Sequence, residues 1–354
     1  MKTTGFVLAI LFPLFASAQI TTSQITGQYF ASNVGIPFLL LTPDARAGAL
    51  GETGVATSAD EYSNHWNASK LAFAEKKMGL GISYTPWLRA LVADVNLAYI
   101  SFFTKNQTNG AIGGSLRYFS MGNITTTPVP GGVAGQYRPN EFALDVSYAR
   151  KLSENFSAGM VARYSRSNLS GATTAQAGNS FGADISATYL REEIIIGSKT
   201  LALSSGLNIS NIGSKIFYSS SGTRYASPLN ARLGGRATMN FGGYHELAVS
   251  CDANNVVANH WPGGFGDQLR STTIGAGMEY IYNDLFTVRA GSFFEGKEYG
   301  VRRYATLGAG VHYHVFSLDF AYLVPYTGLR NPLENTLRFS LQFRFDQFKY
   351  QPVQ

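Results

Sequence analysis

Cysteine is nearly absent from this sequence, because Cys251 is the only one among 354 residues. A single thiol excludes a disulfide framework and a thiolate metal site within one chain. Charged residues are also scarce, at 14%, against about 25% in typical soluble domains. The net charge of +6 is scattered without basic blocks, which excludes a nucleic-acid binder. So little charge indicates a surface that does not all face water.

Long apolar runs are missing as well, except at the start of the sequence. Lys2 precedes the apolar residues 6–15, and Ala16-Ser17-Ala18 supplies the small side chains of a cleavage site. This pattern predicts a secretory signal peptide over residues 1–18 and an exported mature chain from Gln19. The apolar run is too short for a retained transmembrane helix, which needs about 20 residues.

In place of apolar runs, the chain carries segments in which apolar and polar residues alternate. In LRFSLQFRF, residues 337–345, leucine and phenylalanine occupy one face, and arginine, serine and glutamine occupy the other. A period of two predicts a β-strand with unlike faces. Such strands are predicted near 78–87, 93–103, 110–119, 141–150, 156–166, 180–190, 200–210, 229–240, 244–252, 272–281, 285–293, 305–314, 316–323 and 335–345. Most approach the length of about 9–11 residues with which a tilted strand crosses a bilayer.

The connections between these strands alternate in length. Polar turns such as 105–109 and 151–155 are short, whereas the segments at 211–228 and 253–271 are long, and the connection at 191–199 is long for its side. Short periplasmic turns and long extracellular loops are typical of outer-membrane barrels. The predicted fold class is therefore all-β, a transmembrane antiparallel β-barrel of about fourteen strands over residues 78–345. A tail at 346–354 and both termini are expected in the periplasm. A soluble β-sandwich is the alternative.

In a barrel of this kind the apolar faces meet outer-membrane lipid and the polar faces line the lumen. Acids and bases occur together on the lumen faces, so we expect them to pair in a hydrated interior. The predicted lumen residues are Asp94, Arg117, Asp145, Arg163, Asp184, Arg232, Arg236, Glu279, Arg289, Asp319, Arg338 and Arg344.

Residues 19–77 do not alternate. Pro43-Asp44 predicts the start of a short helix over residues 45–49. Asn67 or Ser69 is able to cap a second helical segment within residues 64–73. A segment of this kind ahead of a wide barrel is expected inside it, as a plug.

The stretch PDARAGALGETGVATSADEYSNHWNASKLAF, residues 43–73, resembles the N-terminal signature of the PorV (LptO) family. These are outer-membrane proteins of the type IX secretion system, related in fold to the FadL fatty-acid transporters. The resemblance is carried by Pro43, Asp44, Ala45, Arg46, Gly48, Gly51, Gly54, Asn64, Trp66, Asn67, Leu71 and Phe73. Relatives often have Asn-Pro where this chain has Asn67-Ala68. A PorQ-like branch shares the signature.

The resemblance implies a plugged, FadL-like barrel without enzymatic activity. Members of the family bind beside the large translocon barrel and receive secreted cargo proteins through their C-terminal signal domains. They pass the cargo to a sortase-like attachment complex. Two other roles stay open, namely FadL-like transport of a hydrophobic small molecule and an accessory role in lipid A deacylation. A transporter needs an apolar lumen pocket, so the charged lumen face favours the protein-binding role.

The predicted outer loops carry aromatic residues beside glycine and proline, a composition typical of protein-recognition surfaces. Packing of loop on loop is the alternative. The candidate residues for binding partners or cargo are Phe217, Tyr218, Tyr225, Trp261, Phe265 and Tyr326.

Motifs for catalysis or metal binding are weak. His312 and His314 share a predicted lumen face but have no third ligand, so we predict neither a metal nor a cofactor. GNSFG at 178–182 matches the G-x-S-x-G pattern around Ser180. That nucleophile elbow needs a strand, a sharp turn and a helix, whereas Ser180 opens an alternating strand. His65 is expected to be a structural residue of the plug, and no catalytic residue is predicted.

Overall fold

A computed structural model gives the structure of the chain, and it describes residues 34–87, 94–106, 109–126, 135–169, 176–197, 199–218, 224–257, 264–296, 302–326 and 336–346. The predicted signal peptide, Trp261 and the tail beyond Asp346 lie outside the described residues. None of the described helices is long and apolar enough to span a membrane.

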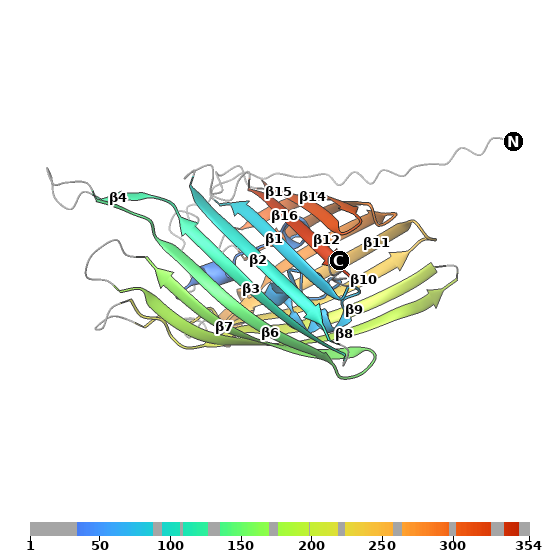
Figure 1. Ribbon diagram of the computed structural model, residues 1–354, viewed down its shortest axis with the longest axis horizontal. Helices are drawn as coiled ribbons and strands as arrows, with labels where there is room; N and C mark the ends of the chain where they lie inside the picture. The colour runs from blue at the N-terminus through green and yellow to red at the C-terminus, as the bar shows by residue number, and fades with distance from the viewer. Residues whose placement is uncertain are drawn as a thin grey trace, which may run out of the picture.

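Fourteen antiparallel strands close into a single barrel (Figure 1), which confirms the predicted fold class. The strands are β1 (Met78–Pro86), β2 (Val95–Lys105), β3 (Gly110–Met121), β6 (Asn140–Lys151), β7 (Phe156–Asn168), β8 (Gly178–Ile196), β9 (Lys199–Gly213), β10 (Asn230–Asn240), β11 (His245–Val256), β12 (Thr273–Tyr282), β13 (Phe286–Phe294), β14 (Arg303–Tyr313), β15 (Phe316–Pro325) and β16 (Leu337–Phe345). Each strand pairs with its neighbours along the chain, and β1 closes the barrel on β16 from Met78↔Phe345 to Tyr84↔Phe339.

Two segments predicted as connections form strands instead. β4 (Ile124–Thr126) and β5 (Gly135–Tyr137) make a separate two-stranded sheet within the long segment between β3 and β6. β8 extends to Ile196 and β9 begins at Lys199, with Ile195 paired to Thr200. A bulge between Arg191 and Ile194 shifts the register of this pair. The charged residues at the bulge interrupt the alternation of apolar and polar residues in the sequence.

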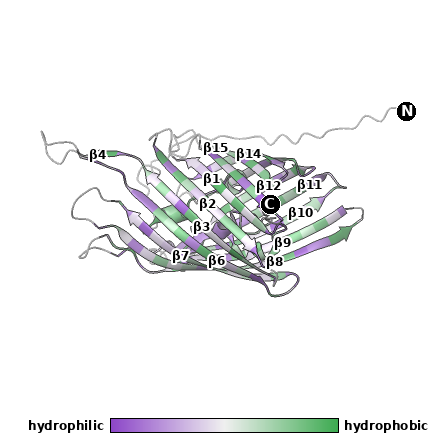
Figure 2. Cartoon of the chain, in the orientation of Figure 1, coloured by the Kyte–Doolittle hydropathy of each residue, from purple (hydrophilic) through white to green (hydrophobic). Residues whose placement is uncertain are grey.

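The two faces of the wall follow the predicted direction. On β1, Leu80, Ile82 and Tyr84 are exposed on the outside, whereas Ser83 and Thr85 are buried. The hydropathy colouring in Figure 2 accordingly changes from residue to residue along the strands. An apolar outer face over a polar interior is the arrangement of barrels that sit in lipid.

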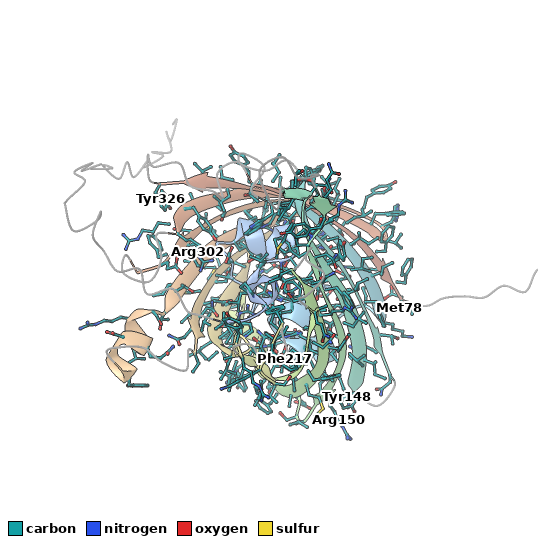
Figure 3. All side chains as sticks on the ribbon, turned by 90° about the vertical axis from the view of Figure 1, so that its left-hand side faces the viewer. Met78, Tyr148, Arg150, Phe217, Arg302 and Tyr326 are labelled. Carbon is teal, nitrogen blue, oxygen red and sulfur yellow. The ribbon has the colours of Figure 1, made fainter. Side chains whose placement is uncertain are left out.

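The N-terminal segment passes through the barrel. It contains η1 (Pro37–Leu40), α2 (Ala45–Ala49), α3 (Ser63–Trp66) and η2 (Ala68–Phe73), and these short helices lie inside the ring of strands in Figures 1 and 3. The backbone N–H of Gly35 donates to Ala226 in the long segment between β9 and β10, whereas Met78 begins β1 at the opposite end. We call residues 34–77 the plug, the end near Ala226 the long-loop end, and the end near Met78 the short-turn end.

The caps of the plug helices form as the sequence predicts. The Asp44 side chain accepts from the N–H of Ala47 at the start of α2, and Asn67 accepts from the N–H of Ser69 at the start of η2. Each bond satisfies a backbone donor that a helix terminus otherwise leaves free.

Candidate functional site

Arg46 of helix α2 connects the plug to the wall. Its Nε and Nη2 atoms donate to the two carboxylate oxygens of Glu279 on β12, at 3.1 and 3.0 Å, and Nη1 donates to Asp60 at 3.1 Å. Glu279 also accepts from Arg236 and Arg289, at 2.6 and 2.7 Å. All five side chains are buried. Two-pronged arginine–carboxylate contacts are strong and directional, so this cluster fixes the position of α2 in the lumen.

Two acids of the plug meet the arginines of the last strand. Glu61 accepts from Arg344 Nε at 2.9 Å, and Glu52 accepts from Arg338 Nη2 at 3.4 Å. The Tyr304 hydroxyl donates to Glu52 at 2.6 Å. The arginine face of β16 therefore points at the plug, and its charge is balanced by acids that lie outside the alternating segments.

Another cluster lies within the wall itself. Arg163 on β7 donates to Asp145 on β6 at 2.7 Å, to Asp184 on β8 at 3.0 Å, and to Asn211 on β9. These contacts agree with the prediction that acids and bases of the lumen faces pair.

The remaining signature residues also contact the wall or each other. Asn64 Nδ2 donates to Ser101 Oγ at 2.9 Å and to Gly114 O at 3.2 Å. Asn67 Nδ2 donates to Thr188 Oγ1 at 2.9 Å. Trp66 Nε1 donates to Asp44 Oδ1 at 2.7 Å, so the indole is tied to the helix cap of α2.

Pro43, Gly48 and Gly51 are placed by close approach to the wall. The carbonyl oxygen of Pro43 accepts from Ser83 Oγ at 2.6 Å. At Gly51 φ is +67°, and a Cβ atom there would lie 2.3 Å from the carbonyl oxygen of Ser292. At Gly48 a Cβ atom would lie 2.5 Å from Arg338 Nη1. At Gly51 the backbone of the wall and the positive φ together require glycine, whereas at Gly48 the Arg338 side chain would have to move.

Burial shifts the pKa values of several plug residues. Burial, and then the neighbouring charge of Asp60, raises the pKa of Asp44 to about 6. Burial lowers the pKa of Lys70 to about 8, although its ammonium group donates to Gly54 O at 2.6 Å and to Thr57 Oγ1 at 2.9 Å. Burial also favours the neutral form of Asp60, but the charges of Lys70 and Arg46 outweigh it and lower the pKa of Asp60. The plug therefore contains buried ionisable groups whose protonation depends on burial and on the charges of their neighbours.

His65 lies between two lumen arginines. Arg117 Nη2 contacts His65 Nδ1, Arg232 Nη1 donates to the His65 carbonyl oxygen at 3.2 Å, and the Arg232 guanidinium lies 5.0 Å from the Trp66 ring. Burial, and then these two positive charges, hold the pKa of His65 well below its ordinary value. No serine, threonine or cysteine side chain bonds to this imidazole among the described residues, so it has no nucleophile to activate.

One cavity beside the plug is small. A cavity of about 20 Å³ lies between the plug and β10 to β13, lined by Leu40, Thr42, Glu52, Trp66, Arg232, Asp252, Asn254, Thr273, Gly275 and Phe293. A space of this size holds about one water molecule. Its lining mixes polar side chains with apolar ones such as Trp66 and Phe293.

Three of the predicted partner-binding residues are exposed at the long-loop end. Phe265 begins α4 (Phe265–Arg270) and is 77% exposed, with Leu269 exposed one turn later. Figure 3 looks onto this end and shows α4 reaching sideways from the wall, with Phe217 and Tyr326 at the mouth. Phe217 and Tyr326 are both exposed, although Tyr326 also donates to Ser292 Oγ at 3.0 Å.

Tyr218 and Tyr225 pack inward. Both rings lie against an apolar cluster that contains Ile36, Phe38 and Ile216. The Tyr218 hydroxyl donates to Ser167 Oγ at 3.0 Å, and the backbone of Tyr225 pairs with Ile216. These two tyrosines hold a loop in place, which corresponds to the loop-packing alternative. Trp261 lies outside the described residues.

Several other predicted positions differ from the structure. Asp94 lies ahead of β2 at the rim and accepts from the N–H of Asn123 at 2.7 Å, so it does not line the lumen. His314 follows β14 in a turn with φ of +53°, and it shares no face with His312. Within the described residues no three His, Cys, Asp or Glu side chains gather as a metal site would require. Ser180 donates to Ser214 O at 3.0 Å and lies within β8, not at an elbow.

The sequence analysis missed Glu52, Glu61 and Lys70. Each is a charged residue in a segment without periodicity, and its partners are 13 to 286 residues away along the chain. The sequence feature that could have indicated these three residues is their charge within an otherwise apolar and glycine-rich stretch.

Three features define the class of this protein: apolar side chains on the outside of the wall, closure of the wall, and a plug held by ion pairs. The class is a plugged β-barrel of the outer-membrane type. Residues 25–261 match the family of the type IX secretion system protein PorV. Since the match covers more than half of the sequence, this chain belongs to the PorV family, whose members are outer-membrane components of type IX secretion. No curated protein sequence matches the chain.

Solved structures share the fold. The toluene transporter TodX of P. putida is 12% identical, with a TM-score of 0.51, over 86% of this chain and 99% of TodX. The toluene transporter TbuX of Ralstonia pickettii is 13% identical, with a TM-score of 0.49, over 85% of this chain and 98% of TbuX. A FadL homologue of Pseudomonas aeruginosa is 12% identical, with a TM-score of 0.48, over 89% of this chain and 100% of that protein. At these identities the likeness concerns the fold alone.

Proposed function

We propose that this protein is a non-enzymatic component of the type IX secretion system that binds cargo proteins through their C-terminal signal domains. It receives them beside the translocon barrel and passes them to a sortase-like attachment complex. One observation carries the proposal. The lumen is occupied by a plug held through buried ion pairs such as Arg46–Glu279, while large rings such as Phe265 stand exposed on the long loops. Binding is therefore assigned to the loops and not to a channel.

The proposed orientation puts the long-loop end outside the cell and the short-turn end, where β16 finishes at Phe345, in the periplasm. The support is the length of the connections, because outer-membrane barrels have short periplasmic turns and long outer loops. In this arrangement residues 1–18 are removed, residues 19–77 form the plug segment, residues 78–345 form the barrel, and the tail at 346–354 is periplasmic.

The loop residues proposed to contact cargo or translocon are Phe217, Phe265 and Tyr326, together with Trp261. Interface energy concentrates in a few large aromatic side chains that become buried on binding. Phe265 and Leu269 lie one helical turn apart on α4, so the two present adjacent apolar groups to a partner. Tyr218 and Tyr225 are proposed to act only by holding their loop.

A FadL-like transporter of hydrophobic small molecules is the second candidate, and the fold shared with TodX favours it. Two features of the described residues weigh against it. Every neighbouring pair of barrel strands is joined by a ladder of paired residues, so the described wall has no lateral gap. The cavity beside the plug, about 20 Å³, is far smaller than a pocket for such a solute.

The experiment replaces the exposed rings and follows secretion of a tagged cargo that bears a C-terminal signal domain. The variant Phe217→Ala/Phe265→Ala should assemble normally, because both side chains are exposed. Each lost ring should weaken cargo capture by about 1 kcal/mol or more, so that tagged cargo accumulates in the periplasm. The matched control is Tyr244→Ala, which removes an exposed ring at the short-turn end and should leave secretion unchanged.

A strain that lacks the protein distinguishes the proposed role from the choice of residues. Normal secretion in that strain removes the shuttle role and leaves the transporter, which is then tested by uptake of a labelled hydrophobic solute. Normal secretion in the loop variant alone removes only the assignment of Phe217 and Phe265.

A further inference from the structure

β8 overruns its neighbour β7 at the short-turn end. The pairing of the two strands ends at Phe156↔Tyr189, yet β8 continues for seven more residues, from Leu190 to Ile196. At the same end β14 passes β13 by two residues, His312 and Tyr313, and β6 passes β3 by one, Lys151. Figure 1 shows the β8–β9 hairpin reaching out at this end of the barrel. The overhang of β8 is therefore the longest of these three.

Within the part of the chain that the structure describes, one edge of the overhang has no partner strand. Asn155 in the β6–β7 turn exchanges hydrogen bonds with Leu190, both at 2.8 Å, and pairing on that side stops there. The pairing described for residues 191–196 is with β9, through Arg191↔Leu203, Ile194↔Leu201, Ile195↔Thr200 and Ile196↔Lys199. The opposite edge presents free backbone N–H and C=O groups, which are a template for another strand.

The side chains of the overhang make this edge unusual. Ile195 is 78% exposed and Ile196 is also exposed, whereas Arg191, Glu192 and Glu193 separate them from the part of β8 that faces lipid. Apolar residues that follow three charged ones along the strand lie past the membrane surface, so lipid does not cover them. Exposed isoleucines on an open strand edge in water call for a protein partner.

The charges give the chemistry of that partner. Glu192 and Glu193 are exposed and form no ion pair within the described residues, and Glu193 has a φ of +59° at the bulge. A basic side chain facing these two carboxylates would balance them. Next to them, Ile195 and Ile196 require apolar side chains in the added strand.

A second copy of this chain does not fit the edge. Two barrels in one membrane are related by an axis along the membrane normal, and barrel strands are tilted by about 35–45°. The same edge in two copies would therefore cross at about twice that angle, and crossed strands do not form a ladder.

We propose that residues 191–196 of β8 bind an extended segment of a soluble periplasmic protein by β-strand addition. The segment carries alternating apolar side chains, with a lysine or arginine opposite Glu192 and Glu193. Main-chain hydrogen bonds give such a contact its affinity, and side-chain pockets give it specificity. The inference rests on the orientation in the proposed function, since that orientation puts this edge in the periplasm.

The test places a photo-crosslinking amino acid at position 194 or 196 of the full-length protein in cells and identifies the crosslinked residues by mass spectrometry. Strand addition predicts adducts with one segment of one protein, in which moving the probe by two positions moves the attachment site by two residues. The variant Ile195→Asp, combined with the probe at 196, should lower the yield at least tenfold while heat-modifiable barrel remains. A probe at Tyr244, an exposed ring in the turn between β10 and β11 at the same end, should give no such adduct.

Four kinds of adduct overturn the proposal: adducts with many unrelated proteins, with another segment of this chain, with a second copy, or with no shift in register. The absence of any adduct overturns it as well.

A separate experiment tests the orientation. In a Cys251→Ser background, Ile195→Cys should react with a membrane-impermeant maleimide only after the outer membrane is opened. Labelling of intact cells would reverse the orientation in the proposed function, whereas the register result bears on strand addition alone.

Discussion

Arg46 of the plug holds Glu279 of strand β12 through two parallel hydrogen bonds, at 3.1 and 3.0 Å, although 233 residues separate them in sequence. Arg236 and Arg289 reach the same carboxylate at 2.6 and 2.7 Å. Glu279 is thus shared by three arginines, one from the plug and two from the wall, while Arg46 also pairs with Asp60 and Arg289 with Asp319. Loss of Glu279 breaks three ion pairs and leaves Arg236 without an ion pair among the described residues, whereas loss of Arg46 leaves Arg236 and Arg289 still paired to Glu279.

This asymmetry predicts that Glu279→Gln destabilises the barrel more than Arg46→Gln. Breaking a buried ion pair by removing one partner costs about 3–5 kcal/mol, and Glu279 is the partner shared by all three. The measurement is the temperature at which the purified protein loses its heat-modifiable form in detergent. Glu154→Gln in an exposed turn should leave that temperature unchanged. A larger effect of Arg46→Gln would contradict the shared role of Glu279.

Gly51→Ala is expected to prevent or strongly reduce assembly. The new Cβ would lie 2.3 Å from the Ser292 carbonyl oxygen in addition to the strain of φ at +67°. Gly242→Ala is the matched control, because its φ is +81° and nothing lies within 4 Å of the added atom. The control bears only the backbone strain, about 1 kcal/mol. The measurement is the yield of folded barrel in the outer membrane for each variant. Equal yields would mean that Gly51 is not in close contact with β13.

The barrel was predictable from sequence for a simple reason. Apolar and polar residues must alternate along a strand that separates lipid from a polar lumen. The sequence of each strand therefore indicates where the strand lies and which of its faces meets lipid. The overhang of β8 was not predictable, because Arg191-Glu192-Glu193 breaks the alternation. Its strand structure comes from pairing with β9 and not from its own pattern.

The partners of the plug could not be read from the sequence at all. The alternation put Glu279 on the lumen face and the signature marked Arg46, but no local rule joins residues so far apart. The aromatic loop residues show the same limit. Tyr218 and Phe217 are adjacent in sequence, yet Tyr218 packs against the apolar cluster with Ile36 while Phe217 is exposed. Burial of a loop side chain depends on neighbours that only the folded chain supplies.

Lys70 predicts a dependence of stability on pH. Burial lowers its pKa from 10.5 to about 8, so between these values the unfolded chain binds a proton that the folded chain does not. Stability therefore rises with pH across this window and is lost as the pH falls through about 8. The contribution is on the order of 3 kcal/mol. Lys70→Met should lack this rise.

The measurement is the midpoint of thermal unfolding in detergent at pH 7.5, 9 and 10.5, compared between wild type and Lys70→Met at each pH. The other titratable groups are the same in both proteins, so the difference between the two isolates Lys70. A constant difference at all three pH values would show that the Lys70 pKa is not lowered.

The outer face of β14 gives a prediction about membrane depth. Leu307 lies near the middle of the strand and Tyr313 at its end, and both are exposed on the outside, at 55% and 63%. Arginine on the lipid face costs about 2–4 kcal/mol at the bilayer midplane and about 0–1 near the interface. Leu307→Arg should therefore reduce folded barrel in a lipid refolding assay far more than Tyr313→Arg. Since both variants add the same side chain to the same face of the same strand, the difference reports depth alone. Equal yields would mean that this face does not meet lipid.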